Sequence, residues 1–342
     1  MYNKRVKRKE EEMEEKRKYT IASFFAGVGG IDLGFQETGR FETLYANEFD
    51  SYPVRTFEEN FPLKVDCRDI HEVMPDDIPD TDLIVGGFPC QAFSIAGYRQ
   101  GFNDEKGRGA LFFELVRIIR KKKPRAVLFE NVKNLVGHDG GRTFRIILEA
   151  LRSEGYRYRY QVLNAMEYGN TPQNRERIYI VGFREEKDFE RFTFPDPIPL
   201  TKGIQDVIDF HGAVDEKYYY RKGRYKGDIF EQLSREMTSQ NAVYQWRRKY
   251  VRRNMSGVVP TLTANMGEGG HNVPLVLTDH GIRKLTPHEC FCVQGFPEEF
   301  RLPEMADSRL YKQAGNSVCV GVIRRIADMI ADALDGEDNK EM

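Results

Sequence analysis

The stretch IASFFAGVGGIDLGF (residues 21–35) joins a short apolar run to a glycine-rich turn and then to an amphipathic run. Small and apolar residues bounded by glycines are typical of a buried strand, and the following residues suit a helix. We therefore predict a strand over 21–25, a tight turn and a helix over 30–38. Because glycine lets the backbone approach a ligand closely, this turn is also a candidate binding site.

The same alternation continues along the chain as far as Phe183. Strands are predicted at 43–47, 83–87, 126–130, 160–165 and 177–183, and helices at 52–60, 110–122 and 142–154. Strands that alternate with helices indicate a parallel sheet with helices on both of its faces. The predicted fold class is α/β, with a doubly wound, mostly parallel sheet.

A second, smaller domain is predicted after this alternation ends. The segment FPDPIPL (194–200) is a proline-rich connection, and residues 200–280 are basic, aromatic and glycine-rich without a clear period. Order returns with a helix in LTPHECFCVQGF (285–296), capped by Thr286 and ended by Gly295, and with a final helix from near Asn316 to about Leu334. We predict a charged tail (1–19), a large domain (20–196 plus 306–335), an inserted, irregular β-rich domain (197–285), a return segment (286–305) and a second tail (336–342).

Composition indicates a globular protein without a membrane span. The 342 residues are 40% hydrophobic and 31% charged, and no apolar stretch approaches the roughly 18 residues of a transmembrane helix. The N-terminal stretch MYNKRVKRKEEEMEEKRKY lacks the apolar segment of a secretory signal, so we expect a cytoplasmic location. The five cysteines suggest no disulfide framework, and Cys290 and Cys292 are interpreted as helix core residues. No metal site is predicted.

Positive charge is concentrated in one segment. The net charge is -1, yet residues 216–254 carry eleven Lys or Arg against four Asp or Glu, interleaved with tyrosines and Trp246. A body of opposite charge that carries one such segment is typical of a protein that binds a phosphate backbone. The alternative is a solvated basic face over an aromatic core.

The glycine turn favours an adenosine-bearing cofactor without a pyrophosphate. Gly27 and Gly29 fit the dinucleotide fingerprint G-x-G-x-x-G, but Asp32 occupies the place of its third glycine. Glu48 ends the next strand about 20 residues later, where a carboxylate accepts hydrogen bonds from ribose hydroxyls.

A candidate nucleophile follows the strand at 83–87. Cys90, in GGFPCQAFSIAG (86–97), lies at the carboxyl end of that strand, where parallel sheets collect their ligands. Glu130 ends the neighbouring strand, and Arg175 and Arg177 alternate in PQNRERIY (172–179). A thiol, a carboxyl and a guanidinium on one edge indicate catalysis. The alternatives are a buried structural cysteine and an ordinary salt bridge.

The ordered set FAGVGG, GGFPCQAFS, FENV, PQNRERIYIVGF, PTLTA (260–264) and GNSV (315–318) closely resembles the DNA cytosine-5 methyltransferases of bacterial restriction-modification type. The resemblance covers about 20–196 and 282–334, whereas 200–257 is the stretch that varies between such enzymes. It implies a Rossmann-like fold, S-adenosyl-L-methionine as the cofactor with S-adenosyl-L-homocysteine as its product, and double-stranded DNA between two domains. The target cytosine would be rotated out of the duplex.

The resemblance also assigns roles to residues. Cys90 would attack C6 of cytosine, Glu130 would act at N3, Arg177 would hold O2, and Arg175 would support the same edge or the phosphates. The cofactor residues that the resemblance implies are Phe25, Gly27, Gly29, Gly30, Glu48, Phe49, Asp69, Pro89, Leu111 and Asn316. The candidate DNA contacts are Gln91, Ser94, Arg247, Arg248, Arg252, Arg253, Asn265, Glu268, His271 and Asn272.

We therefore predict a DNA cytosine-5 methyltransferase that acts as a monomer, with residues 197–285 as its target-recognition domain. A cognate restriction endonuclease would act on the same site without binding this chain. The alternatives are a transfer-RNA cytosine-5 methyltransferase, a non-catalytic DNA-binding protein and a dinucleotide oxidoreductase. The loop after Cys90 departs from the family pattern at Ala96 and in NDEKGRG (103–109). The contacts that this loop makes when it closes are therefore not assigned.

Overall fold

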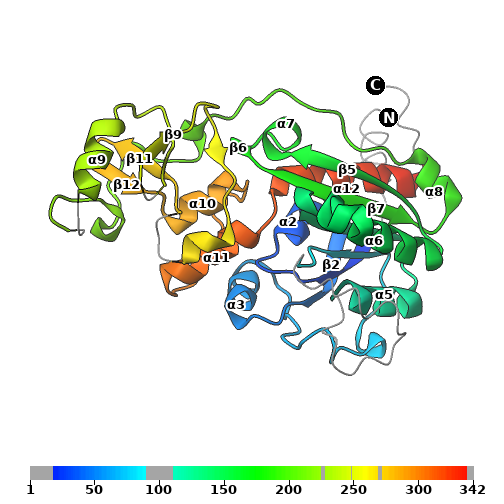
Figure 1. Cartoon of the computed structure of the whole chain (residues 1–342). Helices are drawn as coiled ribbons and strands as arrows, with labels where there is room; N and C mark the ends of the chain where they lie inside the picture. Colours follow the sequence, from blue (N-terminus) through cyan, green and yellow to red (C-terminus); the bar gives the residue numbers. More distant parts are fainter. Residues whose placement is uncertain (1–17, 90–110, 225–227, 248, 269–271, 337–342) are drawn as a thin grey trace, which may run out of the picture.

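The computed structural model describes residues 18–89, 111–224, 228–247, 249–268 and 272–336 (Figure 1). Within them, a six-stranded sheet in the order β2-β1-β3-β4-β7-β5 forms the centre of the large unit. Its strands are β1 (Tyr19–Phe24), β2 (Phe41–Asn47), β3 (Leu83–Gly86), β4 (Ala126–Val132), β5 (Arg157–Asn164) and β7 (Glu176–Phe183). Each predicted strand is therefore present, within a few residues of its predicted bounds.

The direction of the strands brings the predicted site residues to one edge of the sheet. Strands β2, β1, β3 and β4 are parallel, so their carboxyl ends meet at one edge. Strand β7 runs antiparallel to β4, with Val132 opposite Arg177 and Glu130 opposite Tyr179. The start of β7 therefore lies beside the end of β4.

Alternating side chains of the strands pack under helices on both faces. Ile21 and Val85 face a core shared with α2 (Gly30–Gln36) and α12 (Val320–Asp335). Ala22 and Ile84 face the opposite core, which includes α5 (Leu111–Lys122) and α6 (Arg142–Ser153). The period of two along each strand thus produces the doubly wound architecture. Other α-helices among the described residues of the large unit are α3 (Ser51–Asn60), α7 (Ala165–Tyr168) and α8 (Glu186–Arg191).

The small unit (residues 204–285) is built on a second sheet, at the left of Figure 1. The sheet has the order β12-β11-β8-β9, and its paired strands are antiparallel. Its strands are β8 (Tyr244–Trp246), β9 (Val251–Arg253), β11 (Leu275–Thr278) and β12 (Gly281–Lys284), and its helix is α9 (Ile229–Glu236). Leu233 of α9 packs with Tyr244 and Leu275 in a separate core cluster.

Short elements join the two units. Two-residue strands β6 (Gln173–Asn174) and β10 (Val259–Pro260) pair in parallel. Helix α10 (Pro287–Val293) begins after its cap Thr286, whose hydroxyl accepts from the Glu289 N–H, as the sequence predicted. Helix α11 (Asp307–Asn316) packs against the one-turn helix η7 (Ala264–Gly267).

The start of one predicted helix was wrong. The final helix was predicted to begin near Asn316, but Asn316 is the last residue of α11, and α12 begins at Val320. Ser317 is extended, and a Cβ on Gly315 would lie 2.1 Å from the backbone of Thr263. The extended Ser317, whose carbonyl accepts from the buried guanidinium of Arg175, interrupts the helix between α11 and α12. None of the helices in the described ranges is both long and apolar enough to cross a bilayer.

Candidate active site

Glu130 and Arg177 form a buried pair where β4 ends and β7 begins. Arg177 Nε lies 3.1 Å from Glu130 Oε1, and both side chains are largely buried. Burial raises the pKa of the Glu130 carboxyl above its ordinary value, while the positive charges of Arg177 and Arg175 oppose that rise. A carboxyl in this setting keeps its proton to a higher pH than an exposed glutamate does, which suits a proton donor.

The end of β3 lies directly beside this pair. Gly86 is in register with Phe129, and a Cβ on Gly87 would lie 3.3 Å from Glu130 Oε2. The buried amide of Asn131 donates to the Phe88 carbonyl at 2.6 Å. This bond fixes the chain just before Pro89, which is exposed. Sequence reasoning did not single out Asn131, although a polar residue that ends an apolar strand is a signal for such a role.

Three predicted residues of the same stretch, Cys90, Gln91 and Ser94, lie outside the described residues. The structure places the strand that leads to them beside Glu130, and the role of the Cys90 thiol stays a prediction.

Arg175 has a different environment from Arg177. Its side chain is 2% exposed, and its Nη atoms donate to the carbonyls of Leu262, at 2.7 Å, of Gly315, at 3.1 Å, and of Ser317. These contacts link β7 to the PTLTA segment and to the connection between α11 and α12. A guanidinium that donates to three backbone carbonyls holds these segments of the chain together. Its predicted contact with the base edge stays a prediction.

The glycine turn has the geometry of a ligand-binding loop. Phe25, Gly27 and Gly29 have positive φ angles of 52°, 56° and 86°. A Cβ on Gly27 would meet no atom nearer than 4.0 Å, so open space lies above its backbone. Glu48 turns its carboxylate toward the same loop and accepts from the Gly27 N–H at 3.1 Å and from the Asp50 N–H at 2.9 Å.

The other two glycines of the turn are explained by packing. A Cβ on Gly29 would lie 2.4 Å from the ring of Phe61, and one on Gly30 would lie 2.7 Å from Ser317 Oγ. Both positions therefore admit only hydrogen as a side chain. Their predicted contact with a cofactor stays a prediction.

The remaining predicted cofactor residues are spread around this turn. Phe49 follows Glu48 and is 68% exposed, which is unusual for a phenylalanine and leaves its ring free to stack. Asp69 is exposed and accepts from the backbone and the ring of His71. Leu111 is half-buried at the start of α5, and Asn316 is exposed at the end of α11.

Asp32, which breaks the dinucleotide fingerprint, has a structural role that sequence reasoning missed. Its buried carboxylate accepts from Ser23 Oγ and Thr43 Oγ1, both at 3.0 Å, and thereby ties α2 to β1 and β2. Burial raises the pKa of Asp32 to about 6. A glycine at this position would leave both hydroxyls without this acceptor.

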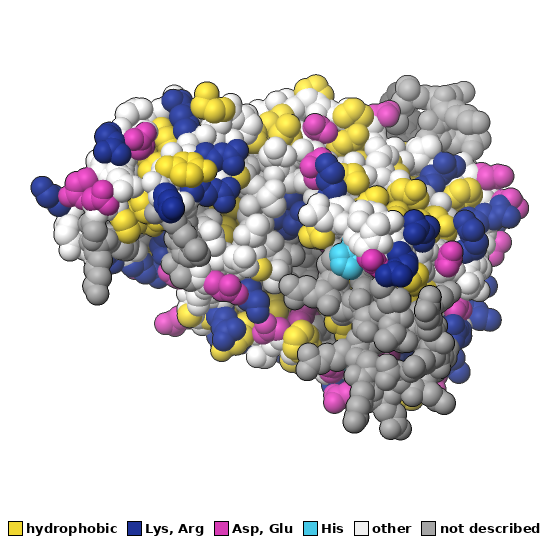
Figure 2. Space-filling model, in the orientation of Figure 1, with side chains coloured by type: hydrophobic (Ala, Val, Ile, Leu, Met, Phe, Trp, Pro, Cys, Tyr) yellow, Lys and Arg dark blue, Asp and Glu magenta, His cyan; other side chains and the backbone are white. Residues whose placement is uncertain are grey.

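The basic segment of the small unit divides into two groups. Lys217 pairs with Asp307, Arg221 pairs with Glu216, and Arg224 donates to backbone carbonyls. For these three cations, the alternative of a solvated basic face without a DNA contact fits. Arg247, Arg252 and Arg253 are exposed instead, and Figure 2 shows Lys and Arg side chains on the lobe that forms the small unit.

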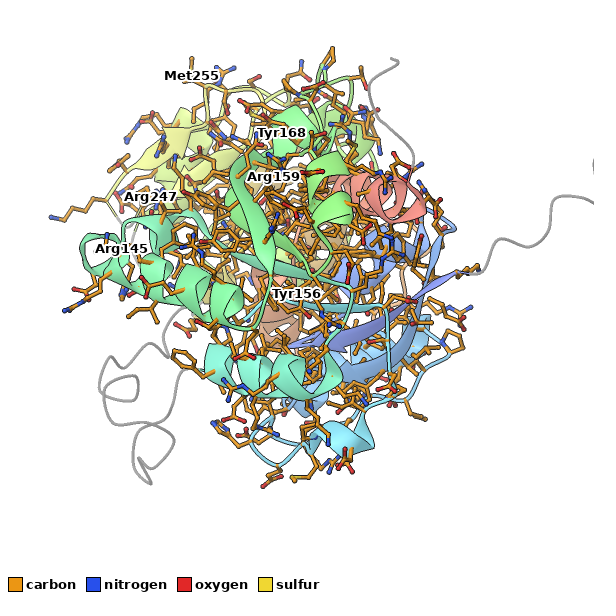
Figure 3. The ribbon with its side chains drawn as sticks, turned by 90° about the vertical axis from the view of Figure 1, so that its right-hand side faces the viewer. Arg145, Tyr156, Arg159, Tyr168, Arg247 and Met255 are labelled. Atoms are coloured by element: carbon orange, nitrogen blue, oxygen red, sulfur yellow. The ribbon has the colours of Figure 1, made fainter. Side chains whose placement is uncertain are left out.

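Figure 3 shows Arg145 of α6 and Arg247 pointing to the same side of the molecule, so cations of both units share one face. Of the other predicted DNA contacts, Asn265 and Glu268 are exposed at η7, and the amide of Asn272 donates to the Asn265 carbonyl at 3.5 Å. Arg248 and His271 lie outside the described residues. Across the described ranges, no cluster of three His, Cys, Asp or Glu side chains could hold a metal ion.

The fold places the chain in a known structural class. A DNMT2 mutant from Spodoptera frugiperda has a TM-score of 0.69 at 18% identity, covering 92% of this chain and 100% of that one. A putative DNA modification methyltransferase from an Escherichia coli prophage has a TM-score of 0.64 at 22% identity, covering 93% and 100%. At these identities the likeness shows the fold alone. It confirms the predicted fold class, the Rossmann-like sheet of methyltransferases.

The sequence then identifies the family. The family model described as C-5 cytosine-specific DNA methylase matches residues 19–332. The chain therefore belongs to this family, and it is a cytosine C5 DNA methyltransferase of the type II restriction-modification kind. The predicted resemblance and activity are confirmed. Of the alternatives, the dinucleotide oxidoreductase and the non-catalytic protein are excluded, and DNA is favoured over transfer RNA.

Curated relatives match over nearly the whole chain. The type II methyltransferase M.Bsp6I of Bacillus sp. (strain RFL6) is 59% identical over 310 residues, covering 91% of this chain and 98% of that protein. The type II methyltransferase M.HhaI of Haemophilus parahaemolyticus is 37% identical over 318 residues, covering 91% and 93%.

Proposed function

We propose that this methyltransferase acts on a cytosine flipped out of a specific duplex site, through a transient bond between Cys90 Sγ and C6 of the base. The observation that carries the proposal is the Glu130–Arg177 pair, which lies beside the strand leading to Cys90. Cytosine C5 is a weak nucleophile within its aromatic ring. Addition of a nucleophile at C6 breaks the conjugation and makes C5 reactive.

Each residue of the pair has a distinct task in this proposal. The Cys90 thiolate adds to C6, and the electron pair of the ring is drawn to N3, where the protonated carboxyl of Glu130 donates a proton. Arg177 donates to O2 and spreads the same charge. After C5 has received the methyl group, it loses its proton to a base, the Cys90 thiolate is expelled, N3 returns its proton to Glu130 and 5-methylcytosine remains.

S-adenosylmethionine is the methyl donor of this family, and the residues at the glycine turn fit it. The open space above Gly27 and the exposed ring of Phe49 suit a ligand that carries an adenosine. Glu48 would accept from ribose hydroxyls, and Phe25, Asp69, Pro89, Leu111 and Asn316 would complete the pocket. When bound, the cofactor supplies an electrophilic methyl group on a sulfonium.

The proposal includes the setting of the enzyme. It acts in the cytoplasm as a monomer. The proposed reaction needs no metal, because it uses only a thiol, a carboxyl, a guanidinium and the cofactor. Exposed cations on the face shared by Arg145 and Arg247 would bind phosphates and fix the register of the duplex. A cognate endonuclease would act on the same DNA site without binding this chain.

Bisulfite sequencing tests this proposal directly. Genomic DNA from cells that express the chain should show protected cytosines confined to one short sequence, and cells that express Cys90→Ala should show none. Protected cytosines that persist at that site in the Cys90→Ala cells would remove this thiol from the mechanism.

A further inference from the structure

A polar hollow of about 360 Å³ lies between the two units, outside the catalytic pair. The large unit contributes Asn174 and Glu176, and the small unit contributes Gln245, Arg247 and Arg252. Glu176 begins β7, the strand that also carries Arg177, so the hollow is close in sequence to the catalytic edge.

The register of β8 and β9 explains which side chains face the hollow. Gln245 is directly opposite Arg252, and Trp246 is opposite Val251. Trp246 and Val251 pack in the core cluster that includes Leu233 of α9, so they lie on the covered face of the sheet. Since neighbouring residues of a strand point to opposite faces, Gln245 and Arg252 project from the other face, into the hollow.

Arg252 and Arg253 are neighbours on this hairpin, but their side chains lie on opposite faces of the sheet. Arg253 is opposite Tyr244, which is fully buried under α9, so Arg253 belongs to the face away from the hollow. The backbone of Arg252 belongs to the β8–β9 ladder, but its guanidinium makes no hydrogen bond or ion pair with any residue in the described part of the chain. Gln245 Oε1 accepts from Arg247 Nη2 at 3.2 Å, which holds the amide beside the open guanidinium of Arg252.

The mixed chemistry of the hollow favours base edges over phosphates. A phosphate offers only acceptors, and the Glu176 carboxylate in the same hollow would repel it. The Glu176 carboxylate in this hollow accepts from Lys133 Nζ at 2.8 Å. The edges of base pairs in the major groove offer both donors and acceptors, and an arginine paired with O6 and N7 of guanine is the commonest specific contact.

We propose that Gln245 and Arg252 read base edges of the recognition sequence, with Arg252 bound to a guanine through both of its terminal nitrogens. This inference rests on the proposed function, because it requires a duplex in the cleft. Sequence reasoning listed Arg252 among many candidates and omitted Gln245. The strand register separates Arg252 from Arg253, which sequence alone could not do.

The test compares Arg252→Ala with the matched control Arg253→Ala on duplexes that carry every base at each position of the site. Arg252→Ala should lower kcat/KM for the preferred guanine by about 10- to 100-fold, and the preference at that one position should disappear. Arg253→Ala, on the face away from the hollow, should leave the base preference unchanged at every position of the site. Gln245→Ala should weaken the base preference at a neighbouring position of the DNA site.

A second variant separates a base contact from a phosphate contact. Arg252→Lys keeps the charge but loses the two-pronged geometry, so it should remain as indiscriminate as Arg252→Ala. If Arg252→Ala instead weakens all duplexes equally, or if Arg252→Lys discriminates like the wild type, the inference is overturned while the methyltransferase activity stands. A wild-type enzyme that methylates no cytosine in any duplex would overturn the proposed function, and this inference with it.

Discussion

At the scale of single residues, burial and partners decide which polar groups act and which only hold the structure. Glu130 and Arg175 were both predicted to be catalytic. The structure gives Glu130 the guanidinium of Arg177 as a partner and gives Arg175 three backbone carbonyls. The sequence predicts the presence of both groups at one edge. It could not predict their partners, because Leu262, Gly315 and Ser317 come from distant parts of the chain.

Glu130→Gln tests the proton donor. The amide cannot deliver a proton to N3, so we expect the single-turnover rate of methyl transfer to fall by about 10²- to 10⁴-fold. In the wild type, the pKa of Glu130 is raised by burial, so the protonated acid persists to higher pH and the rate should fall as pH rises through that raised value. The variant should lack this descending limb.

Glu149→Gln, on the exposed face of α6, is the matched control and should leave the pH profile unchanged. A near-normal rate for Glu130→Gln, or an unchanged descending limb, would show that N3 is activated by another group.

At the scale of elements, the local pattern predicts strands and helices well and predicts their ends less well. The strands before residue 183 and the capped helix at Thr286 follow from local signals of hydrophobic period and capping. The end of α11 does not, because it falls at the extended Ser317, whose carbonyl accepts from Arg175, a residue distant in the sequence. The irregular small unit gave no clear period, since its strands are three or four residues long.

A buried ion pair between β12 and α10 gives a second test. Arg283 is fully buried, and its Nη1 and Nη2 lie 2.7 Å from Glu289 Oε2 and Oε1. Glu289→Ala leaves the guanidinium buried without its counter-charge, so we expect a loss of about 3–5 kcal/mol in the free energy of unfolding, measured with urea. The double variant Arg283→Met/Glu289→Leu should lose clearly less than the sum of its single variants. Additive losses, or a loss below about 1 kcal/mol for Glu289→Ala, would mean that this pair does not join the two elements.

At the scale of the whole molecule, an inserted unit completes a site that begins near the N-terminus. One core cluster contains Val28 and Phe57 of the large unit together with Val243 and Val276 of the small unit. The long connection after α8, drawn in green in Figure 1, carries the chain across to the small unit, and α12 returns to pack on α2. The loss of the strand–helix alternation after Phe183, and its return near residue 285, predict this insertion and return. The domain boundaries stay a prediction, since α11, which was assigned to the large domain, packs on η7 of the inserted segment.

The central claim is the transient bond between Cys90 and the target base, and a duplex with 5-fluorocytosine at the target position tests it most directly. Fluorine at C5 cannot leave as a proton does, so the enzyme should stop after methyl transfer with its sulfur still attached to C6. With S-adenosylmethionine present, wild-type protein should form a denaturant-resistant adduct that mass spectrometry maps to Cys90, and Cys90→Ala should form none. Wild-type protein that methylates ordinary cytosine in this site but never forms the adduct would contradict the account.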